Sequence, residues 1–243
     1  GSVQPVELTV PPHCILNAQP PAATGARLLV GHFVVPLLFG AFSKAIPDRV
    51  QADPGMLNVI NVTGQRRDQR DFSTMFFSSG GLGGMNGLDG QSATVAPANM
   101  KTMPAEIWET MTHLTLVERR LRCDSGGAGK FRGGLGQTLT LRNDTGQPVY
   151  IALLGSRTEF PAKGFSGGND AALRRFIVDG EVVHPKGRYV LRPGAHITVE
   201  DSGGGGFGDP STRSRRMVQS DVAAGFISET AAREIYNLAS TLE

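Results

Sequence analysis

The chain has 243 residues, of which 40% are hydrophobic and 19% charged, and this composition excludes disorder over its whole length. Lys and Arg number 24 against 22 Asp and Glu, a balance that excludes a dedicated binder of nucleic acid or of an acidic membrane surface. Two cysteines, Cys14 and Cys123, are too few for a disulfide scaffold. We therefore expect free thiols and a reducing, cytoplasmic location.

The first part of the chain is expected to form a strand, an apolar helix and two further strands. Residues 3–10 alternate, whereas Gly1-Ser2 looks like a cloning remnant and no signal peptide follows it. The longest apolar stretch, residues 28–43, is shorter than the roughly 20 residues that span a membrane. It predicts a buried helix that breaks or kinks near Pro36. Strands are expected over 55–64 and 70–79.

The middle of the chain is expected to be rich in strands. A strand is suggested over 91–97, and a short helix over 102–112 has Thr102 as its N-cap and Pro104 in its first turn. The next strand, 114–122, is followed by a predicted hairpin whose strands surround a turn at residues 143–146.

The remainder is expected to add a second hairpin, two strands and a helical tail. Asp179-Gly180 supplies the left-handed positions of a two-residue hairpin turn. Two strands surround Pro193-Gly194, and the tail has predicted caps at Asp209 and Ser228. The predicted fold class is α+β, with a β-rich central region containing hairpins, an apolar N-terminal helix and C-terminal helices. We treat residues 3–241 as one region and leave open a sub-boundary near residue 112.

Motifs for metal and phosphate binding are weak. The five histidines form no closely spaced pair and neither cysteine sits in a C-x-x-C, so we predict no metal bound by this chain. A phosphate loop fails because Phe131 stands where Ser or Thr must follow Gly-Lys. Residues 203–208 match G-x-G-x-x-G, but no second parallel strand with an acidic tip follows, so a dinucleotide site is a minor alternative.

A hydrolase nucleophile is a second minor alternative. Ser166 lies in a G-x-S-x-G match, and a triad would use His184 or His196. The residues before it are polar and interrupted by proline, whereas the nucleophile elbow follows an apolar strand and precedes a helix.

Glycine is the compositional outlier, with 32 residues. The glycines gather in four clusters, at 78–90, 125–136, 164–168 and 203–208. Any one cluster is equally well explained as a turn between packed strands. For the four together we expect close packing of backbone at an interface or cleft, because glycine lets backbone approach another group closely.

The glycine clusters and their flanks resemble signature segments of the hydantoinase B/5-oxoprolinase family. The similar segments keep the family order and cover nearly the whole chain: 15–27, 88–99, 103–109, 121–137 and 203–236. The chain departs from the family pattern at Ala105, Cys123 and Asn237. Family members are usually about twice as long, so the resemblance identifies this chain as a C-terminal portion without the N-terminal portion that carries metal-binding His and Asp residues.

The resemblance implies ATP-dependent opening of a cyclic amide such as a hydantoin or 5-oxoproline. It also implies an A-type ATPase subunit or domain as partner, an oligomer, and ATP and a divalent metal in the complete enzyme, with no cofactor bound by this segment. We expect five polar residues beside the signature segments to contact substrate or support the residues that do: Asp89, Asn99, Glu106, Asp124 and Arg132. A cap, turn or buried salt bridge is at least as good an explanation for each. A subunit of an acetone- or acetophenone-type carboxylase and a non-catalytic assembly module are the alternatives.

Overall fold

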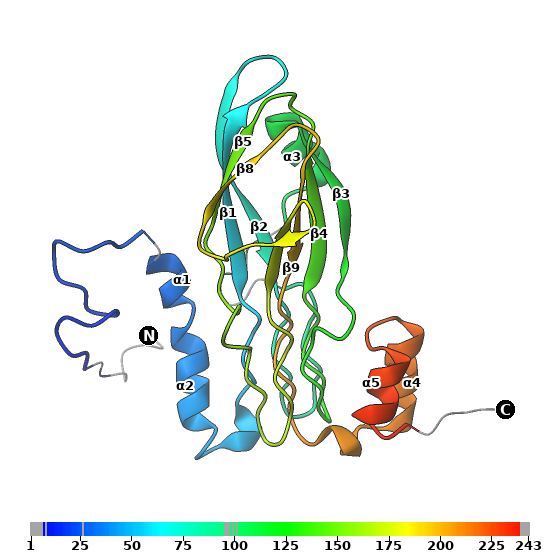
Figure 1. Cartoon of the computed structure of the whole chain (residues 1–243). Coiled ribbons are helices and arrows are strands. Elements are labelled where there is room, and N and C mark those ends of the chain that lie inside the picture. The colour runs from blue at the N-terminus through cyan, green and yellow to red at the C-terminus, as the bar shows by residue number, and fades with distance from the viewer. Residues whose placement is uncertain are drawn as a thin grey trace.

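The computed structural model describes residues 7, 9–25, 27–94, 98, 100 and 102–238. It contains two antiparallel sheets, a bundle of extended glycine-rich segments below them, and helices on either side of that bundle (Figure 1). The expected α+β class is therefore confirmed. The expected strand over 3–10 falls mostly outside the described residues, as does the second half of the one suggested over 91–97. The described residues 91–94 form no strand.

The first sheet has the order β2-β1-β5-β8 and the second the order β3-β4-β9-β6-β7. The strands of the first sheet are β1 (Leu57–Gln65), β2 (Asp71–Ser79), β5 (Val149–Leu153) and β8 (Arg188–Leu191). Those of the second are β3 (Leu114–Leu121), β4 (Gln137–Asn143), β9 (His196–Glu200), β6 (Arg175–Val178) and β7 (Glu181–Val182).

The inner faces of the two sheets form one hydrophobic core. Leu139 and Leu141 alternate with threonines along β4, so both leucines face inward. They share the core with Ile60 from β1 and with Trp108 from helix α3 (Ala105–Thr112). The Trp108 ring meets the Phe76 ring edge-on, with 4.8 Å between centroids. Helix α3 therefore closes one end of the sandwich.

The predicted hairpin around residues 143–146 is wrong. Strands β4 and β5 are well-formed, but β4 pairs with β3 and β9 whereas β5 pairs with β1 and β8. The chain crosses from one sheet to the other here because both strands carry inward apolar side chains that must fill opposite sides of the same core. The hairpin β6–β7 is confirmed, with Asp179 and Gly180 both at positive φ in its turn.

The N-terminal apolar stretch forms two short helices, α1 (Arg27–Gly31) and α2 (Val34–Phe42), instead of one buried helix. The break lies at His32-Phe33 and not near Pro36, which sits in the first turn of α2, where proline is tolerated. Pro36 is the one buried residue of α2. The prediction of burial is therefore wrong for this helix within the described residues.

The helix caps agree with the sequence in part. The Asp209 carboxylate accepts the Ser211 N–H at the start of a 3₁₀ turn over Pro210–Thr212, and the Ser228 hydroxyl accepts the Ala231 N–H. Two helices follow, α4 (Arg215–Ala223) and α5 (Glu229–Glu234). The predicted Thr102 cap is wrong, because α3 begins after Pro104. A second 3₁₀ turn spans Pro47–Arg49.

The four glycine clusters pack against one another beneath the sandwich. The central run is Gly203–Gly206, whose amides donate to carbonyls of four different segments: Ser125, Gly134, Asp53 and Asn169. Bonds that leave a segment toward several neighbours do not build a ladder, and they suit extended helices of the polyproline II type. A Cβ atom on Gly204 would lie 2.0 Å from the Leu82 carbonyl oxygen. The clusters therefore pack closely, backbone against backbone, but they do so among segments of this chain and not at the expected interface or cleft.

Candidate functional site

Four charged side chains meet where the glycine bundle contacts α4. Both Asp89 carboxylate oxygens accept from the Arg213 guanidinium at 2.7 Å, a bidentate pair. The same guanidinium donates to Asp221 of α4 at 2.7 Å. Arg132 completes the group, because its backbone N–H donates to Asp89 at 2.7 Å and its Nε donates to Asp221 at 3.4 Å. We call these four residues the charged cluster.

The charged cluster is neutral overall and largely shielded from water. The Arg213 side chain is 1% exposed and the Asp89 side chain 26%. Burial alone lowers the pKa of Arg213, but its hydrogen bonds and the charges of Asp89 and Asp221 outweigh burial and raise that pKa. The Arg132 guanidinium also lies over the Phe226 ring, 5.2 Å from its centroid. The cluster therefore attaches α4 to the glycine bundle.

The structure brings Asp89 and Arg132 together, as two of the five predicted site residues. Their carboxylate and guanidinium groups are already paired inside the protein, which makes a free general base here unfavourable. Sequence reasoning missed Arg213 and Asp221, the other two members. Both lie in the 203–236 signature segment, and Asp221 is the single acidic residue between positions 210 and 228. That isolated acid in a basic segment was the available signal.

Asp124 lies at a separate contact with the C-terminal helices. Its side chain accepts the Ser228 N–H at 2.8 Å, and its backbone N–H donates to the Phe226 carbonyl at 3.1 Å. Asp124 is exposed and borders a cavity of about 110 Å³ that Asp170 and Tyr236 also line. Burial raises the pKa of Tyr236. Asp124 is thus the predicted residue that combines an exposed carboxylate with a cavity.

The other two predicted residues do not join this region. Glu106 is exposed on α3, at the far end of the sandwich from α4 and α5 (Figure 1). Its neighbour Glu109 makes the local bond, accepting the Leu116 N–H at 2.9 Å. Asn99 lies outside the described residues.

A second buried ion pair joins the sandwich to the glycine bundle. Arg174 donates to Asp201 at 2.8 Å, and neither side chain is exposed. The remaining guanidinium N–H groups donate to backbone carbonyls of Gly55 and Met56 and to Ser156. Sequence reasoning missed this pair as well. Because every bond is internal, its role is to fix the segments that enter the bundle.

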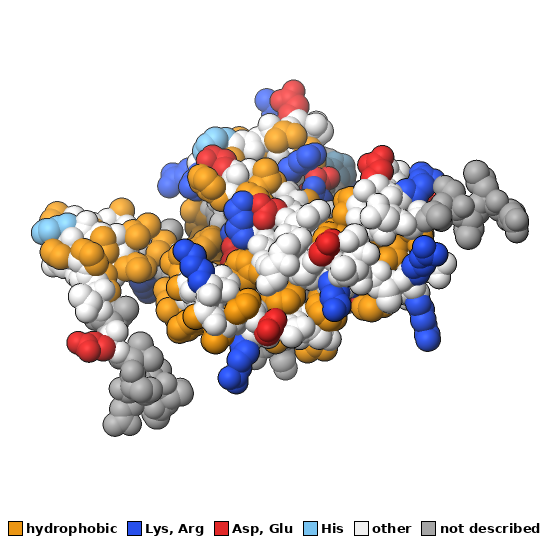
Figure 2. Space-filling model, turned by 90° about the horizontal axis from the view of Figure 1, so that it is seen from below, with side chains coloured by type: hydrophobic (Ala, Val, Ile, Leu, Met, Phe, Trp, Pro, Cys, Tyr) orange, Lys and Arg blue, Asp and Glu red, His pale blue; other side chains and the backbone are white. Residues whose placement is uncertain are grey.

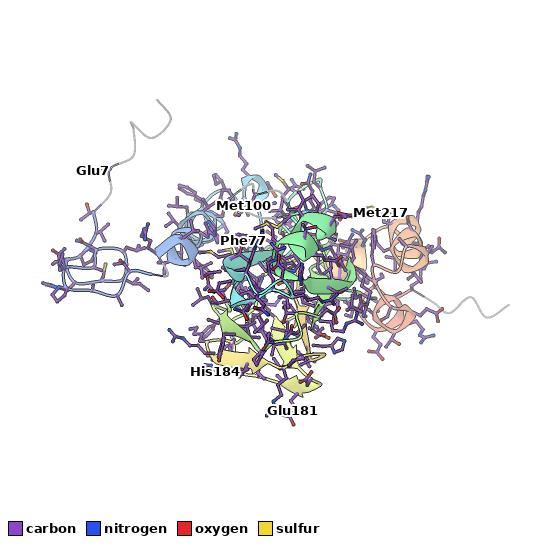
Figure 3. All side chains as sticks on the ribbon, turned by 90° about the horizontal axis from the view of Figure 1, so that it is seen from above. Glu7, Phe77, Met100, Glu181, His184 and Met217 are labelled. Carbon is purple, nitrogen blue, oxygen red and sulfur yellow. The ribbon has the colours of Figure 1, made fainter. Side chains whose placement is uncertain are left out.

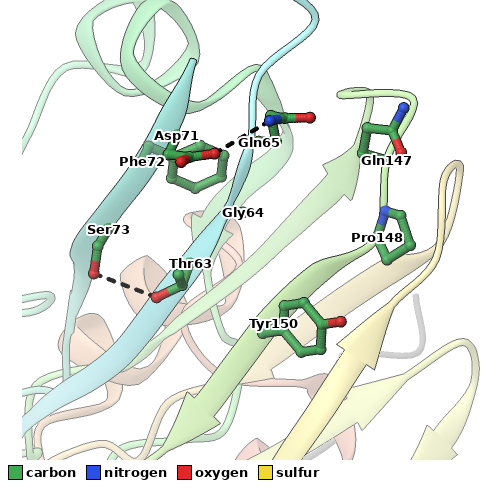
Figure 4. A pocket seen from close by; sticks show the side chains of 9 residues that line it. All are labelled: Thr63, Gly64, Gln65, Asp71, Phe72, Ser73, Gln147, Pro148 and Tyr150. Atoms are coloured by element: carbon green, nitrogen blue, oxygen red, sulfur yellow. Dashed lines mark hydrogen bonds between the residues drawn. The ribbon is translucent and has the colours of Figure 1, made fainter. Parts of the chain in front are cut away.

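Two larger hollows lie elsewhere, one on the first sheet and one beside α1. One, of about 540 Å³, opens beyond the point where β1 and β5 stop pairing, and Thr63, Gln65, Asp71, Ser73 and Tyr150 are among its lining residues (Figure 4). Its polar groups bond to one another: the Thr63 and Ser73 hydroxyls lie 3.3 Å apart, and Gln65 donates to Asp71 at 3.2 Å. The other, of about 460 Å³, lies between α1 and residues 154–160.

The two minor motif alternatives lack their structural context. In the 203–208 match, the amides of Gly203–Gly206 already donate to protein carbonyls, so none of these four is available for a pyrophosphate. Ser166 has φ +53° and forms a tight turn with Gly167, closed by a bond from the Gly168 N–H to the Phe165 carbonyl. No strand of either sheet leads directly into this turn, and no helix begins directly after it.

Across 9–25, 27–94 and 102–238, no three His, Cys, Asp or Glu side chains gather closely enough to hold a metal ion. Within the same part of the chain, no helix combines the length and apolar character needed to cross a membrane.

Comparison with known proteins identifies relatives over almost the whole chain. The family described as Hydantoinase B/oxoprolinase matches residues 1–210. The chain is 27% identical to the B-type subunit of a "Putative D-/L-hydantoinase" from Pseudomonas sp. (strain NS671), covering 99% of this chain and 42% of that protein. It is 31% identical to the caprolactamase β-subunit of Pseudomonas jessenii, covering 82% of this chain and 37% of that protein.

Two solved structures share the fold. The ATP-dependent caprolactamase from Pseudomonas jessenii superposes with a TM-score of 0.70 at 26% identity, over 83% of this chain and 38% of that one. Nucleotide-free acetone carboxylase superposes with a TM-score of 0.69 at 21% identity, over 82% of this chain and 32% of that one. This chain spans about two fifths of the length of the two curated relatives. The chain belongs to the Hydantoinase B/oxoprolinase family.

Proposed function

We propose that the chain is part of the B-type subunit of an ATP-dependent enzyme that hydrolyses cyclic amides such as hydantoins, 5-oxoproline or lactams. The observation that carries this proposal is the family match over residues 1–210, together with relatives named as hydantoinase and caprolactamase subunits. A 5-oxoprolinase of Pestalotiopsis fici, 27% identical over 86% of this chain, adds a third cyclic amide.

The complete enzyme would draw ATP and a divalent metal from parts beyond these residues. The described residues supply no cluster of metal ligands, so they do not fit a metal site and no metal-dependent step is assigned to them. An A-type subunit or domain would bind ATP and activate the amide carbonyl by phosphorylation, and a further B-type portion would complete the hydrolysis. This chain would then supply one wall of the reaction cleft and contacts between subunits.

The five predicted site residues would divide this work. Asp124 and Glu106 are exposed and therefore free to meet a substrate or a partner. Asp89 and Arg132 would act as positioning residues, because their bonds hold α4 against the glycine bundle. Asn99 is kept as a substrate-binding residue from the sequence alone.

The test is reconstitution with an A-type partner, followed by assays of ATP hydrolysis and ring opening with hydantoin, 5-oxoproline and caprolactam as separate substrates. We expect ATP turnover that depends on one of these amides. An Asp124→Ala variant that keeps its fold is expected to lose most of this activity, whereas Glu181→Ala on the exposed strand β7 keeps it. Full activity of Asp124→Ala removes Asp124 from the site, and no amide-dependent turnover in the parent complex refutes the proposed reaction.

A carboxylase is the second candidate. Acetone carboxylase alpha subunit of Xanthobacter autotrophicus is 26% identical over 55% of this chain. Bicarbonate-dependent ATP turnover with a small ketone, and none with cyclic amides, would favour this function over hydrolysis. An assembly module without a catalytic contribution is the third candidate. It predicts that an A-type protein binds the chain while substitutions at Asp124 and Glu106 leave turnover unchanged.

A further inference from the structure

Helix α2 has the composition of a buried helix but an exposed position. Its nine residues, VVPLLFGAF, include no charged or polar side chain, and a helix that is apolar all round is normally enclosed. Here Leu37 is 63% exposed. Most of the large apolar side chains of α1 and α2 are exposed with it, and we call these residues the N-terminal apolar face: Leu28, Val34, Val35, Leu37, Leu38 and Phe42.

The helix pair is attached to the rest of the protein along one side. Leu29 of α1 packs on Leu57 and Val59 of β1, and the Arg157 guanidinium lies 5.1 Å from the Phe33 ring centroid. Pro36 provides the buried contact of α2. Figure 1 shows both helices lying along the flank of the sheets and bundle, and Figure 2 shows hydrophobic side chains gathered on that side of the molecule. In Figure 1 the N-terminal segment before α1 extends away on the opposite side of the pair, and Leu37 and Leu38 remain 63% and 50% exposed.

The N-terminal apolar face adjoins a concave site. The cavity of about 460 Å³ is lined by Leu29 and Val30 of α1, by Phe33 between the helices and by Phe160 of the facing loop, and its lining also includes Arg157, Glu159 and Lys186. Phe160 is 77% exposed. A protein interface typically combines protruding apolar side chains with a pocket that accepts an anchoring side chain from the partner. The aliphatic and aromatic part of this lining would accept an aliphatic or aromatic side chain.

We propose that the N-terminal apolar face and the adjoining cavity form the docking surface for the part of a B-type subunit that lies outside these 243 residues. This inference rests on the proposed function, and it names the surface through which the two portions assemble. The occupant would be an apolar polypeptide segment that inserts one large side chain into the cavity.

Length and chemistry favour this occupant. The matched region covers 42% and 37% of two curated relatives, so more than half of each relative has no counterpart here. The face itself carries no charged side chain among its named residues, so the occupant is expected to be apolar where it meets the face, whereas Arg157, Glu159 and Lys186 offer charged groups only at the cavity. A helix of nine residues is about 14 Å long, against a hydrocarbon layer of about 30 Å, so a membrane is a poor occupant.

The first test is site-specific photocrosslinking in the complete B-type subunit, either as one polypeptide or as co-purified portions. A benzophenone amino acid replaces Leu38, and Val182 on β7 serves as the control position. Val182 is 70% exposed, and its neighbour Glu181 lies on a different side of the molecule from α1 and α2 (Figure 3). We expect Leu38 crosslinks to map to residues outside this chain and the Val182 position to give none there.

Crosslinks from Leu38 to a second copy of the same helix, to an A-type partner or to nothing would overturn the proposal. The measurement uses no turnover, so it separates a wrong docking surface from a wrong reaction. Hydrogen exchange provides an independent readout. The α2 amides are expected to exchange at least about 10-fold more slowly in the complete subunit than in the 243-residue chain, as enclosure of a helix requires. Equal exchange rates would also overturn the proposal.

Discussion

Replacement of Gly205 by alanine tests whether the glycine bundle is packed as tightly as its backbone contacts imply. A Cβ on Gly205 would lie 2.0 Å from the Lys163 carbonyl oxygen and 2.8 Å from the Gly164 nitrogen. Both contacts are backbone, so no flexible side chain can move aside. The new methyl group therefore displaces a neighbouring segment by more than an ångström.

The cost follows from the bonds that this displacement breaks. The Gly205 N–H donates to the Asp53 carbonyl at 2.8 Å, and its own carbonyl accepts the Gly84 N–H at 2.8 Å. Leaving buried groups unpaired costs about 1–3 kcal/mol each, and overpacking adds about 1–3 kcal/mol. We expect the free energy of unfolding to fall by about 3–9 kcal/mol. At about 2–4 °C per kcal/mol for a domain of this size, Tm falls by at least about 6 °C and by up to about 36 °C.

The assay is thermal and urea denaturation followed by circular dichroism, with Gly25→Ala as the matched control. A Cβ on Gly25 meets no atom within 4 Å, and its φ is not positive. That variant is expected to change stability by less than about 1 kcal/mol, because it mainly restricts the unfolded chain. A Gly205→Ala protein that melts within about 2 °C of the Gly25→Ala protein would refute close packing of the bundle.

Three further outcomes are expected. Arg213→Met leaves the carboxylates of Asp221 and Asp89 without their main partner. The free energy of unfolding measured by urea titration should fall by about 3–5 kcal/mol. A loss below about 1 kcal/mol would contradict the structural role of the charged cluster. Burial lowers the pKa of His32 in the folded protein. As the pH falls, His32 therefore binds a proton at a higher pH in the unfolded chain than in the folded protein. Stability should be full above about pH 6.5 and decline as the pH falls, and His32→Gln should remove that part of the decline in melts at about pH 7.5 and 5. Burial, and after it the charge of Asp124, raises the pKa of the Cys123 thiol. Asp124→Asn should therefore increase the thiolate fraction and speed the alkylation of Cys123 by iodoacetamide at about pH 8. An unchanged rate would contradict the effect of Asp124 on Cys123.

Local features of the fold were predictable because short-range chemistry determines them. The bounds of β1 and β2 were predicted to within two residues, and the Asp179-Gly180 pair predicted the β6–β7 turn. Asp209 and Ser228 were identified as caps because a side-chain oxygen that accepts an early helical N–H leaves a recognisable residue pattern.

Sheet membership was not predictable in the same way. The turn after β4 has the residues of a hairpin, yet β5 pairs in the other sheet, because the inner faces of both sheets must fill one core. The pairing within the charged cluster was not predictable for a related reason. Asp89 and Arg213 are 124 positions apart, and nothing local to either residue specifies the other. The exposure of α2 was also not predictable from the sequence, because an all-apolar segment predicts burial regardless of which polypeptide encloses it.

The position of the buried ion pairs follows from what glycine removes. A bundle of glycine segments buries few side-chain carbons apart from residues such as Leu135 and Phe207, so it depends strongly on backbone hydrogen bonds, each worth about 1 kcal/mol. Such a bundle is stabilised at its edges, where residues with larger side chains follow the glycines. Arg174 with Asp201 holds the end next to the sandwich, and Arg213 with Asp89 holds the side next to α4. Arginine suits both places because its planar group bonds a carboxylate and several carbonyls at once. The ion pairs thus add side-chain bonds at the edges of the bundle, and at α4 they stand beside the small core that Ala128 forms with Val218 and Ile227.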